Sequence, residues 1–270
     1  QRAQEKLASL SAQIGGPQRW PDYSDLTLDP QDPAGNFLRV QAWGHAQRMA
    51  DLNKPTDRDR WDTSPHIVNA FAAGQNRIVF PAGILQAPFF DAKASDAANY
   101  GGIGMVIGHE ITHHFDDRGR QYDAVGNLKD WWAPEDAAAY KARADRVAEL
   151  YSSYEALPGL RINGRQMLGE NISDLGGINI AFDALQLALK RQNLSAAETE
   201  AAARAFFANN ALIWRGKQRP EALEQQIRTG QHSPGPFRVR GPMSNMPAFA
   251  QAYGCKPGDG MVADSPVSVW

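Results

Sequence analysis

The residues best suited to chemistry lie together at positions 109–113, in the order His-Glu-Ile-Thr-His. Small and apolar residues around them predict a buried helix over 100–115. Residues four apart in a helix share a face, so His109 and His113 can bind one metal ion. Glu110 can take a proton from a water molecule that the metal activates. The pattern therefore predicts a zinc site with Glu110 as general base. A helix with two surface histidines fits these apolar surroundings less well, because charges there are costly without a purpose.

A catalytic zinc needs a third protein ligand and one open position. Metzincins place Gly three residues and His six residues after the second His, but this chain has Asp116 and Gly119 there, which excludes that class. Glu170 lies 57 positions after His113, in the run Glu-Asn-Ile-Ser-Asp. Glu170 and Asp174 are four apart and share a helix face, so one can bind zinc while the other holds a histidine ring by its free nitrogen.

Helical patterns account for most of the chain, so the fold class is mainly α with a small β-sheet. Two short β-branched runs, 67–71 and 77–80, predict a hairpin around Gly74-Gln75-Asn76. Residues 20–33 predict an extended connection, 117–132 a loop or small hairpin, and 229–242 a loop rich in Gly, Ser and Pro. Ser195 and Glu198 form a capping box. The predicted helices are 1–13, 36–52, 100–115, 134–154, 167–191, 195–214 and 220–228.

Composition narrows the function classes. The chain has 270 residues and a formal net charge of −2, which provides no electrostatic footprint for nucleic acid. The sequence contains no apolar run long enough to predict a membrane-spanning segment. Cys255 is the single cysteine, so no disulfide can form within the chain.

Several motifs in the same order make the chain resemble the neprilysin and endothelin-converting-enzyme family of zinc metallopeptidases. The family carries HExxH on one helix and ExxxD on a later one, here HEITH at 109–113 and ENISD at 170–174. The remaining motifs are Asn69-Ala70-Phe71, Pro-Ala-Gly-Ile-Leu-Gln at 81–86, His-Ser-Pro-Gly at 232–235 and Phe-Arg-Val at 237–239. The resemblance runs from near Trp20 to Trp270 and implies a thermolysin-like zincin catalytic domain.

The resemblance implies a role for each matching residue around the zinc. His109, His113 and Glu170 would bind one Zn²⁺ per chain, and Glu110 would be the general base. Asp174 would orient a zinc-binding histidine.

Three further positions match residues that contact the substrate in the family. Asn69 and the backbone of Ala70 would hold the peptide as an added strand, which is β-augmentation. His232 would stabilise the developing oxyanion, and Arg238 would bind a substrate carbonyl. His45, His66 and His114 match no role and are interpreted as structural.

The expected activity is hydrolysis of internal bonds in oligopeptides, on the amino side of large apolar residues, outside the cytoplasm. Residues 1–270 would be the C-terminal catalytic region, without the family's N-terminal cap, which then becomes a partner beside the peptide substrate. The chain ends Val267-Ser268-Val269-Trp270, where many family members have Cys-Arg-Val-Trp. The Arg of that motif could contact the C-terminus of a substrate. Because it is missing here, a preference for short peptides with a free carboxylate is in question.

Two other functions compete with this one. The chain could bind zinc and act as a catalytically incomplete binding module. It could also be a thermolysin-like or aminopeptidase-type HExxH enzyme, but those place the third ligand much closer to the second His.

Overall fold

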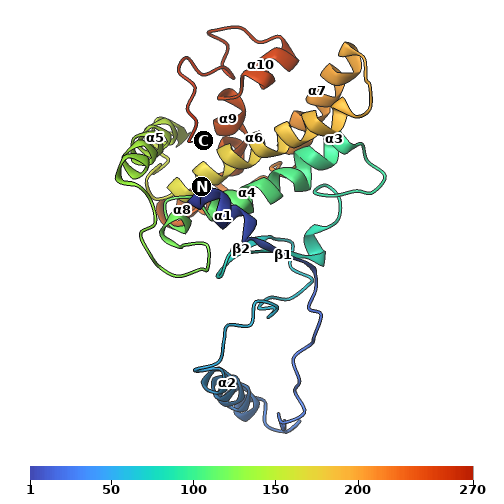
Figure 1. The fold of residues 1–270 in the computed structure, drawn as a ribbon, viewed down its shortest axis with the longest axis vertical. Coiled ribbons are helices and arrows are strands. Elements are labelled where there is room, and N and C mark those ends of the chain that lie inside the picture. The colour runs from blue at the N-terminus through green and yellow to red at the C-terminus, as the bar shows by residue number, and fades with distance from the viewer. Residues whose placement is uncertain (270) are drawn as a thin grey trace.

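The computed structural model describes residues 1–269, so Trp270 at the expected C-terminal motif lies outside the described residues. A helical body carries a long arm that ends in one helix (Figure 1). The helices are α1 (Arg2–Ala8), α2 (Pro33–Ala50), α3 (Asp96–Asn99), α4 (Met105–His113), α5 (Pro134–Ser152), α6 (Leu168–Lys190), α7 (Ala196–Ile213), α8 (Pro220–Thr229), α9 (Gly235–Ser244) and α10 (Pro247–Tyr253). The strands are β1 (Ser11–Gly15), β2 (Phe71–Ala73), β3 (Arg77–Pro81), β4 (Glu155–Leu157) and β5 (Leu160–Arg161).

The mainly helical fold with a small sheet is confirmed. Strand β3 lies at the centre of a three-stranded sheet, with β1 parallel on one side and β2 antiparallel on the other. Every residue of β3 is buried. Strands β4 and β5 form a separate pair. Strand β2 is therefore an edge strand, with one row of backbone groups available for pairing.

The predicted hairpin forms, but its first strand is shorter than expected. Strand β2 starts at Phe71, and residues 67–70 lie outside it. Val68 is 57% exposed, so this β-branched residue lacks the half-buried surface that favours a strand. Gln75 and Asn76 both have positive φ in the turn. The loop at 117–132 contains a single bridge, between Tyr122 and Leu128, which agrees with the small hairpin expected there.

The predicted first helix is too long. Helix α1 ends at Ala8, and the next residues form β1 beside β3. The backbone N–H of Ser11 donates to Asn76 O at 2.9 Å, which begins the pairing. A long-range strand partner overrides the helical propensity of a short segment.

The predicted loop at 229–242 is also wrong in part, because residues 235–244 form helix α9. Proline is compatible with the first helical turn, so Pro236 near the start of α9 does not prevent it. Helix α10 follows and ends at Gly254, whose φ of 68° suits a glycine. The other long helices match their predicted ranges within a few residues, and the Ser195–Glu198 capping box is present.

Helix α6 is the central element of the body, because both of its sides pack into apolar clusters. One cluster joins α6 to α5 through Ile172, Val147 and Tyr151. Another joins α6 to α7 through Leu185 and Phe206. A third cluster, around Ile78, Phe80 and Val106, lies between the sheet and α4.

Helices α4 and α6 lie side by side across the body (Figure 1) and touch through glycines on both of them. A Cβ at Gly108 would lie 2.6 Å from Gly177 O, and one at Gly177 would lie 2.6 Å from His109 N. A Cβ at Gly176 would meet Thr112 Oγ1 at 2.6 Å. Any side chain at this crossing would force the helices apart, so backbone contact sets the separation of the two motifs.

The arm consists of residues 17–65 and carries α2 away from the body (Figure 1). Helix α2 starts at the Asp32 cap, whose side chain accepts from Gly35 N, and buries none of its residues. Phe37 and Leu38 are 65% and 67% exposed. Within residues 1–269, no helix is both long and apolar enough to cross a bilayer.

We predict that Gly177→Ala destabilises the protein and weakens zinc binding. The added methyl would overlap the backbone of His109, and such overpacking costs about 1–3 kcal/mol of unfolding free energy. Displaced ligands should also lower zinc affinity about tenfold or more. Chemical denaturation and chelator competition measure the two effects. Gly260→Ala is the control, since no atom of residues 1–269 lies within 4 Å of its Cβ position. Wild-type stability in Gly177→Ala would contradict the crossing argument.

Candidate metal centre

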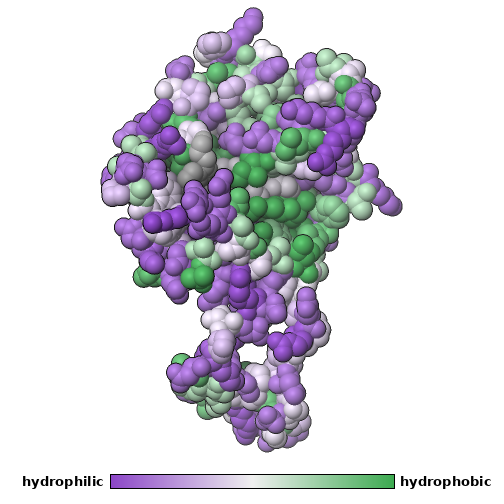
Figure 2. Space-filling view, viewed as in Figure 1, coloured by the Kyte–Doolittle hydropathy of each residue, from purple (hydrophilic) through white to green (hydrophobic). Residues whose placement is uncertain are grey.

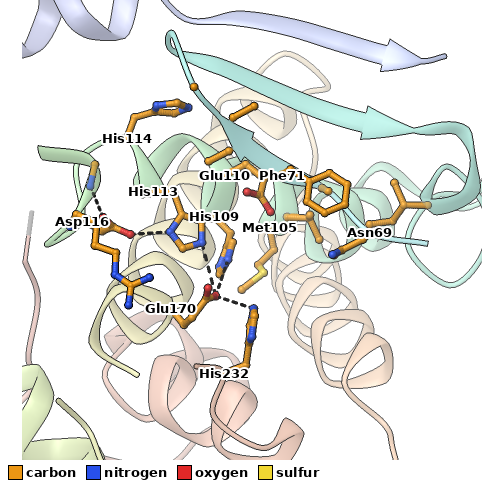
Figure 3. A pocket seen from close by; sticks show the side chains of 18 of the residues that line it. Asn69, Phe71, Met105, His109, Glu110, His113, His114, Asp116, Glu170 and His232 are labelled. Carbon is orange, nitrogen blue, oxygen red and sulfur yellow. Dashed lines mark hydrogen bonds and ion pairs between the residues drawn. The ribbon is translucent and has the colours of Figure 1, made fainter. Parts of the chain in front are cut away.

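His109 and His113 lie one turn apart on α4, with ring centroids 4.5 Å apart. Their Nε2 atoms turn toward Glu170, near the start of α6 (Figure 3). Glu170 Oε2 lies 3.3 Å from His109 Nε2 and 3.5 Å from His113 Nε2. The two motifs therefore meet, as the spacing on each helix predicts.

The donor set of this centre fits a zinc ion. The ligand atoms of His109, His113 and Glu170 all lie within 4.8 Å of one another. Glu170 Oε2 is buried and has no hydrogen-bond partner of good geometry among residues 1–269. Two imidazoles and one carboxylate on converging helices match a catalytic zinc site, which uses three protein ligands. His232, in the loop before α9, places its Nε2 3.1 Å from the same Glu170 oxygen.

A carboxylate contacts the other nitrogen of each histidine. Asp174 Oδ1 lies 2.8 Å from His109 Nδ1, the position expected for a residue that orients this ring. Asp116 Oδ2 lies 2.7 Å from His113 Nδ1, and the Ser173 hydroxyl lies 3.0 Å from the same nitrogen. Such partners set the ring orientation and tautomer of metal-binding histidines.

The contact between Asp116 and His113 was not expected from the sequence, where Asp116 served only to exclude the metzincins. The available signal was a carboxylate three residues after a ligand, near the end of the same helix. Ser173, by contrast, carries no pattern that distinguishes it from other serines.

Arg238 is buried and forms a bidentate ion pair with Asp174. Its Nε donates to Oδ2 at 2.8 Å and its Nη2 to Oδ1 at 2.7 Å. The guanidinium also lies 3.8 Å from the centroid of the Trp214 ring, a close cation–π contact. Arg238 thus fixes the carboxylate that holds His109. It also lines the cleft, where guanidinium N–H groups beyond these two remain as donors.

The carboxylates create a field that favours positive charge at the centre. Burial by itself lowers the pKa of His113, but Asp116 and Glu170 outweigh it and raise this pKa to about 10. Burial also lowers the pKa of His109, but Asp174 and Glu170 outweigh it and raise this pKa overall. Burial raises the pKa of Glu170, yet the three neighbouring histidines lower it overall. The same field stabilises a bound dication.

Glu110 lies beside the ligand pair and is 6% exposed. Its carboxylate lies between His109 and β2, and Asn69 lies on the same side of the cleft (Figure 3). Asn69 is exposed and Ala70 is buried, and both directly precede the edge strand β2. The expected base and the expected peptide-binding segment therefore border one space.

A cleft of about 840 Å³ is bordered by the two histidines, Glu110, Glu170, His232 and Arg238, and by Asn69 and Ala70. Apolar side chains form part of its wall, namely Ile84, Phe89, Met105, Val106 and Trp214. His114 points away from the metal centre (Figure 3), and its Nε2 lies 3.1 Å from Arg77 O. Burial lowers the pKa of His114 to about 4, which agrees with the structural role expected for it.

Comparison with known proteins identifies the class. The sequence profile of peptidase family M13 matches residues 69–269, and the chain belongs to this family. It is 37% identical to human neprilysin over its whole length and 37% identical to human endothelin-converting enzyme 1 over 99% of its length. It spans 38% and 36% of those two proteins, respectively.

Solved structures agree with this assignment. The zinc metalloprotease Zmp1 of Mycobacterium tuberculosis, in complex with an inhibitor, superposes with a TM-score of 0.91 at 42% identity. This match covers all of the present chain and 42% of the Zmp1 chain. PepO from Lactobacillus rhamnosis superposes with a TM-score of 0.88 at 34% identity, over 97% of this chain and 41% of its own.

We predict that zinc binding releases protons at pH 7. The pKa of His113 is raised to about 10, so its ring carries a proton at neutral pH, whereas zinc requires neutral imidazole. The carboxylates of Asp174 and Glu170 raise the pKa of His109 as well. Release should be at least about one proton per zinc, and zinc affinity should rise with pH. Calorimetry in buffers of different ionisation enthalpy measures the release. Asp116→Asn should reduce it, because that carboxylate raises the pKa of His113. Zinc binding without proton release would contradict the electrostatic account.

Proposed function

We propose that this chain is the catalytic region of a zinc-dependent endopeptidase that hydrolyses internal bonds of oligopeptides. The convergence of His109, His113 and Glu170 beside Glu110 carries the proposal. Family membership supports it, since neprilysin and Zmp1 are relatives that match the entire chain. We assign one Zn²⁺ to each chain, held by these two histidines and this glutamate.

Zinc, when bound, would polarise the scissile carbonyl and make water more acidic. Glu110 then takes the proton from the attacking water and passes it to the leaving amine, as a general base and then a general acid. His232 donates to the oxygen on which negative charge develops. Asp174 acts through His109, whose ring it holds. Glu110 and His232 border the cleft, and Asp174 contacts His109, which also borders it.

The substrate peptide would lie along β2. Strand β2 pairs with β3 on one side only, so its other edge is available for an extended peptide. Asn69 and the Ala70 backbone adjoin that edge and would bind the main chain of the substrate. Arg238 would donate its remaining N–H groups to a substrate carbonyl while it stays paired with Asp174.

The catalytic claim is tested by Glu110→Gln. This variant should keep zinc, because it leaves every ligand in place, and should lose hydrolysis of a quenched internal peptide by about 100-fold or more. Metal analysis and fluorescence measure the two properties. Substantial turnover in Glu110→Gln would contradict the role of Glu110 as the general base. Stoichiometric zinc in an inactive wild type, even with the rest of the protein supplied, would favour the alternative of a zinc-binding module without catalysis.

We further propose cleavage on the amino side of large apolar residues. The apolar wall of the cleft includes Phe89 and Val106, which suit an apolar side chain next to the reacting bond. In a peptide series that varies this residue, Leu or Phe should exceed Gly in kcat/KM by about tenfold or more. Equal values across the series would contradict the preference.

The remainder of the protein is the partner that we propose for the arm and for one face of the body. The chain spans 38% of neprilysin, and α2 buries none of its residues. Apolar surface also gathers on the face of the body seen in Figure 2. Exposed apolar side chains on the two central helices are Ile107 of α4 and Ile180 and Leu187 of α6. Exposed apolar surface of this kind marks contact sites. We propose that residues 1–270 are a C-terminal catalytic region and that the partner of the arm is an N-terminal part, which caps this region. Unchanged hydrogen exchange in α2 on adding that part would contradict the contact.

We propose that the protein acts outside the cytoplasm, in the periplasm, at the cell envelope or after secretion. Family membership supports this location. Recovery of the protein only in the cytoplasmic fraction would overturn it.

A further inference from the structure

Lys6 of helix α1 is a buried lysine close to the metal centre. The residue is 1% exposed, and its ammonium donates to three backbone oxygens. These are His114 O at 2.6 Å, Gly119 O at 2.7 Å and Tyr122 O at 2.6 Å. All three carbonyls belong to the loop that directly follows α4. The N-terminal helix is therefore attached to the end of the metal-binding helix by one side chain.

The geometry favours a cation with several donors at this point. An ammonium has three N–H donors, and each finds one carbonyl, so the group is fully satisfied. The rings of Phe115 and Trp131 lie 5.3 and 5.6 Å from the Lys6 nitrogen and add cation–π attraction. Burial lowers the pKa of Lys6 to about 8, so the side chain stays mostly charged at neutral pH. An apolar side chain would leave the convergent buried carbonyls without donors, which is costly.

The same loop carries Asp116, the carboxylate that contacts His113 Nδ1 at 2.7 Å. Asp116 Oδ1 accepts hydrogen bonds from the backbone N–H groups of Arg118 and Gly119, at 2.8 and 2.7 Å. Gly119 thus binds Asp116 through its N–H and Lys6 through its carbonyl. The loop passes so close to α4 that a Cβ at Gly119 would lie 1.8 Å from His113 O.

We propose that Lys6 is a positioning residue of the metal centre, which fixes the 114–122 loop so that Asp116 holds the His113 ring in its zinc-binding orientation. This inference rests on the proposed zinc site. It also extends the functional unit beyond the region matched by the family profile, which begins at residue 69.

The test compares Lys6→Met with Phe206→Leu in the zinc-loaded protein. Lys6→Met keeps the side-chain length and removes the charge and the donors. Phe206 is fully buried between α6 and α7, so Phe206→Leu is a destabilised control far from the loop. Zinc affinity by chelator competition should fall about 10–100-fold in Lys6→Met, the range seen when groups that orient metal ligands are removed. It should stay within about twofold in Phe206→Leu.

A double-mutant cycle distinguishes positioning from general stabilisation. If Lys6 acts through Asp116, the Lys6→Met loss should largely disappear in an Asp116→Asn background, because the residue it positions is already gone. Losses that add fully, or wild-type zinc affinity in Lys6→Met, would overturn the proposal. If Lys6→Met does not fold, Lys6→Gln replaces it, since its amide retains N–H donors without the charge. It should show a smaller loss, and wild-type affinity there would equally overturn the proposal.

These readouts separate this inference from the proposed function. A wild-type protein that binds zinc but hydrolyses no peptide would contradict the activity, while the affinity comparison would still decide the role of Lys6. A wild-type protein without zinc affinity would contradict both.

Discussion

The close crossing of α4 and α6 is the constraint on which the rest of the structure depends. Gly108 and Gly177 leave no side chain between the two backbones, so a Cβ on either would meet the other helix at 2.6 Å. At that separation, side chains of α4 contact side chains of α6 directly, with no residue between them. His109 meets both Glu170 and Asp174 for this reason. The sheet, the cleft and the outer helices are arranged around this pair, and α6 packs into apolar clusters on both sides.

Charge at the centre forms one connected network. Arg238 holds Asp174, Asp174 holds His109, and Glu170 faces the histidines. On the other side, Asp116 holds His113 and is itself fixed by backbone N–H groups. Oriented partners of this kind keep metal ligands in place before the metal arrives, which reduces the cost of binding. The carboxylate that orients each histidine ring also raises the pKa of that ring, Asp174 for His109 and Asp116 for His113. The preference for a cation and the orientation of the rings therefore have the same origin.

The sequence was sufficient to place His109 and His113 side by side on α4, because a spacing of four on a helix determines which side chains share a face. The position of Glu170 beside these histidines could be expected only once the two motifs were considered together. Strand β1 and helix α9 were not predictable, since β1 depends on β3, far along the chain, and α9 begins in a run that reads as a loop. The contacts of Asp116 and Lys6 were missed for a similar reason. Each depends on how the loop after α4 folds back, and local patterns carry no information about that path.

Anomalous diffraction at the zinc absorption edge, on crystals of the zinc-loaded protein, tests the central claim most directly. We expect one peak per chain, about 2.0–2.2 Å from His109 Nε2, His113 Nε2 and a Glu170 oxygen. His232 lies near the same oxygen but should remain unbound to the metal. A peak that has His232 in place of Glu170, or zinc bound elsewhere in the chain, would contradict the account.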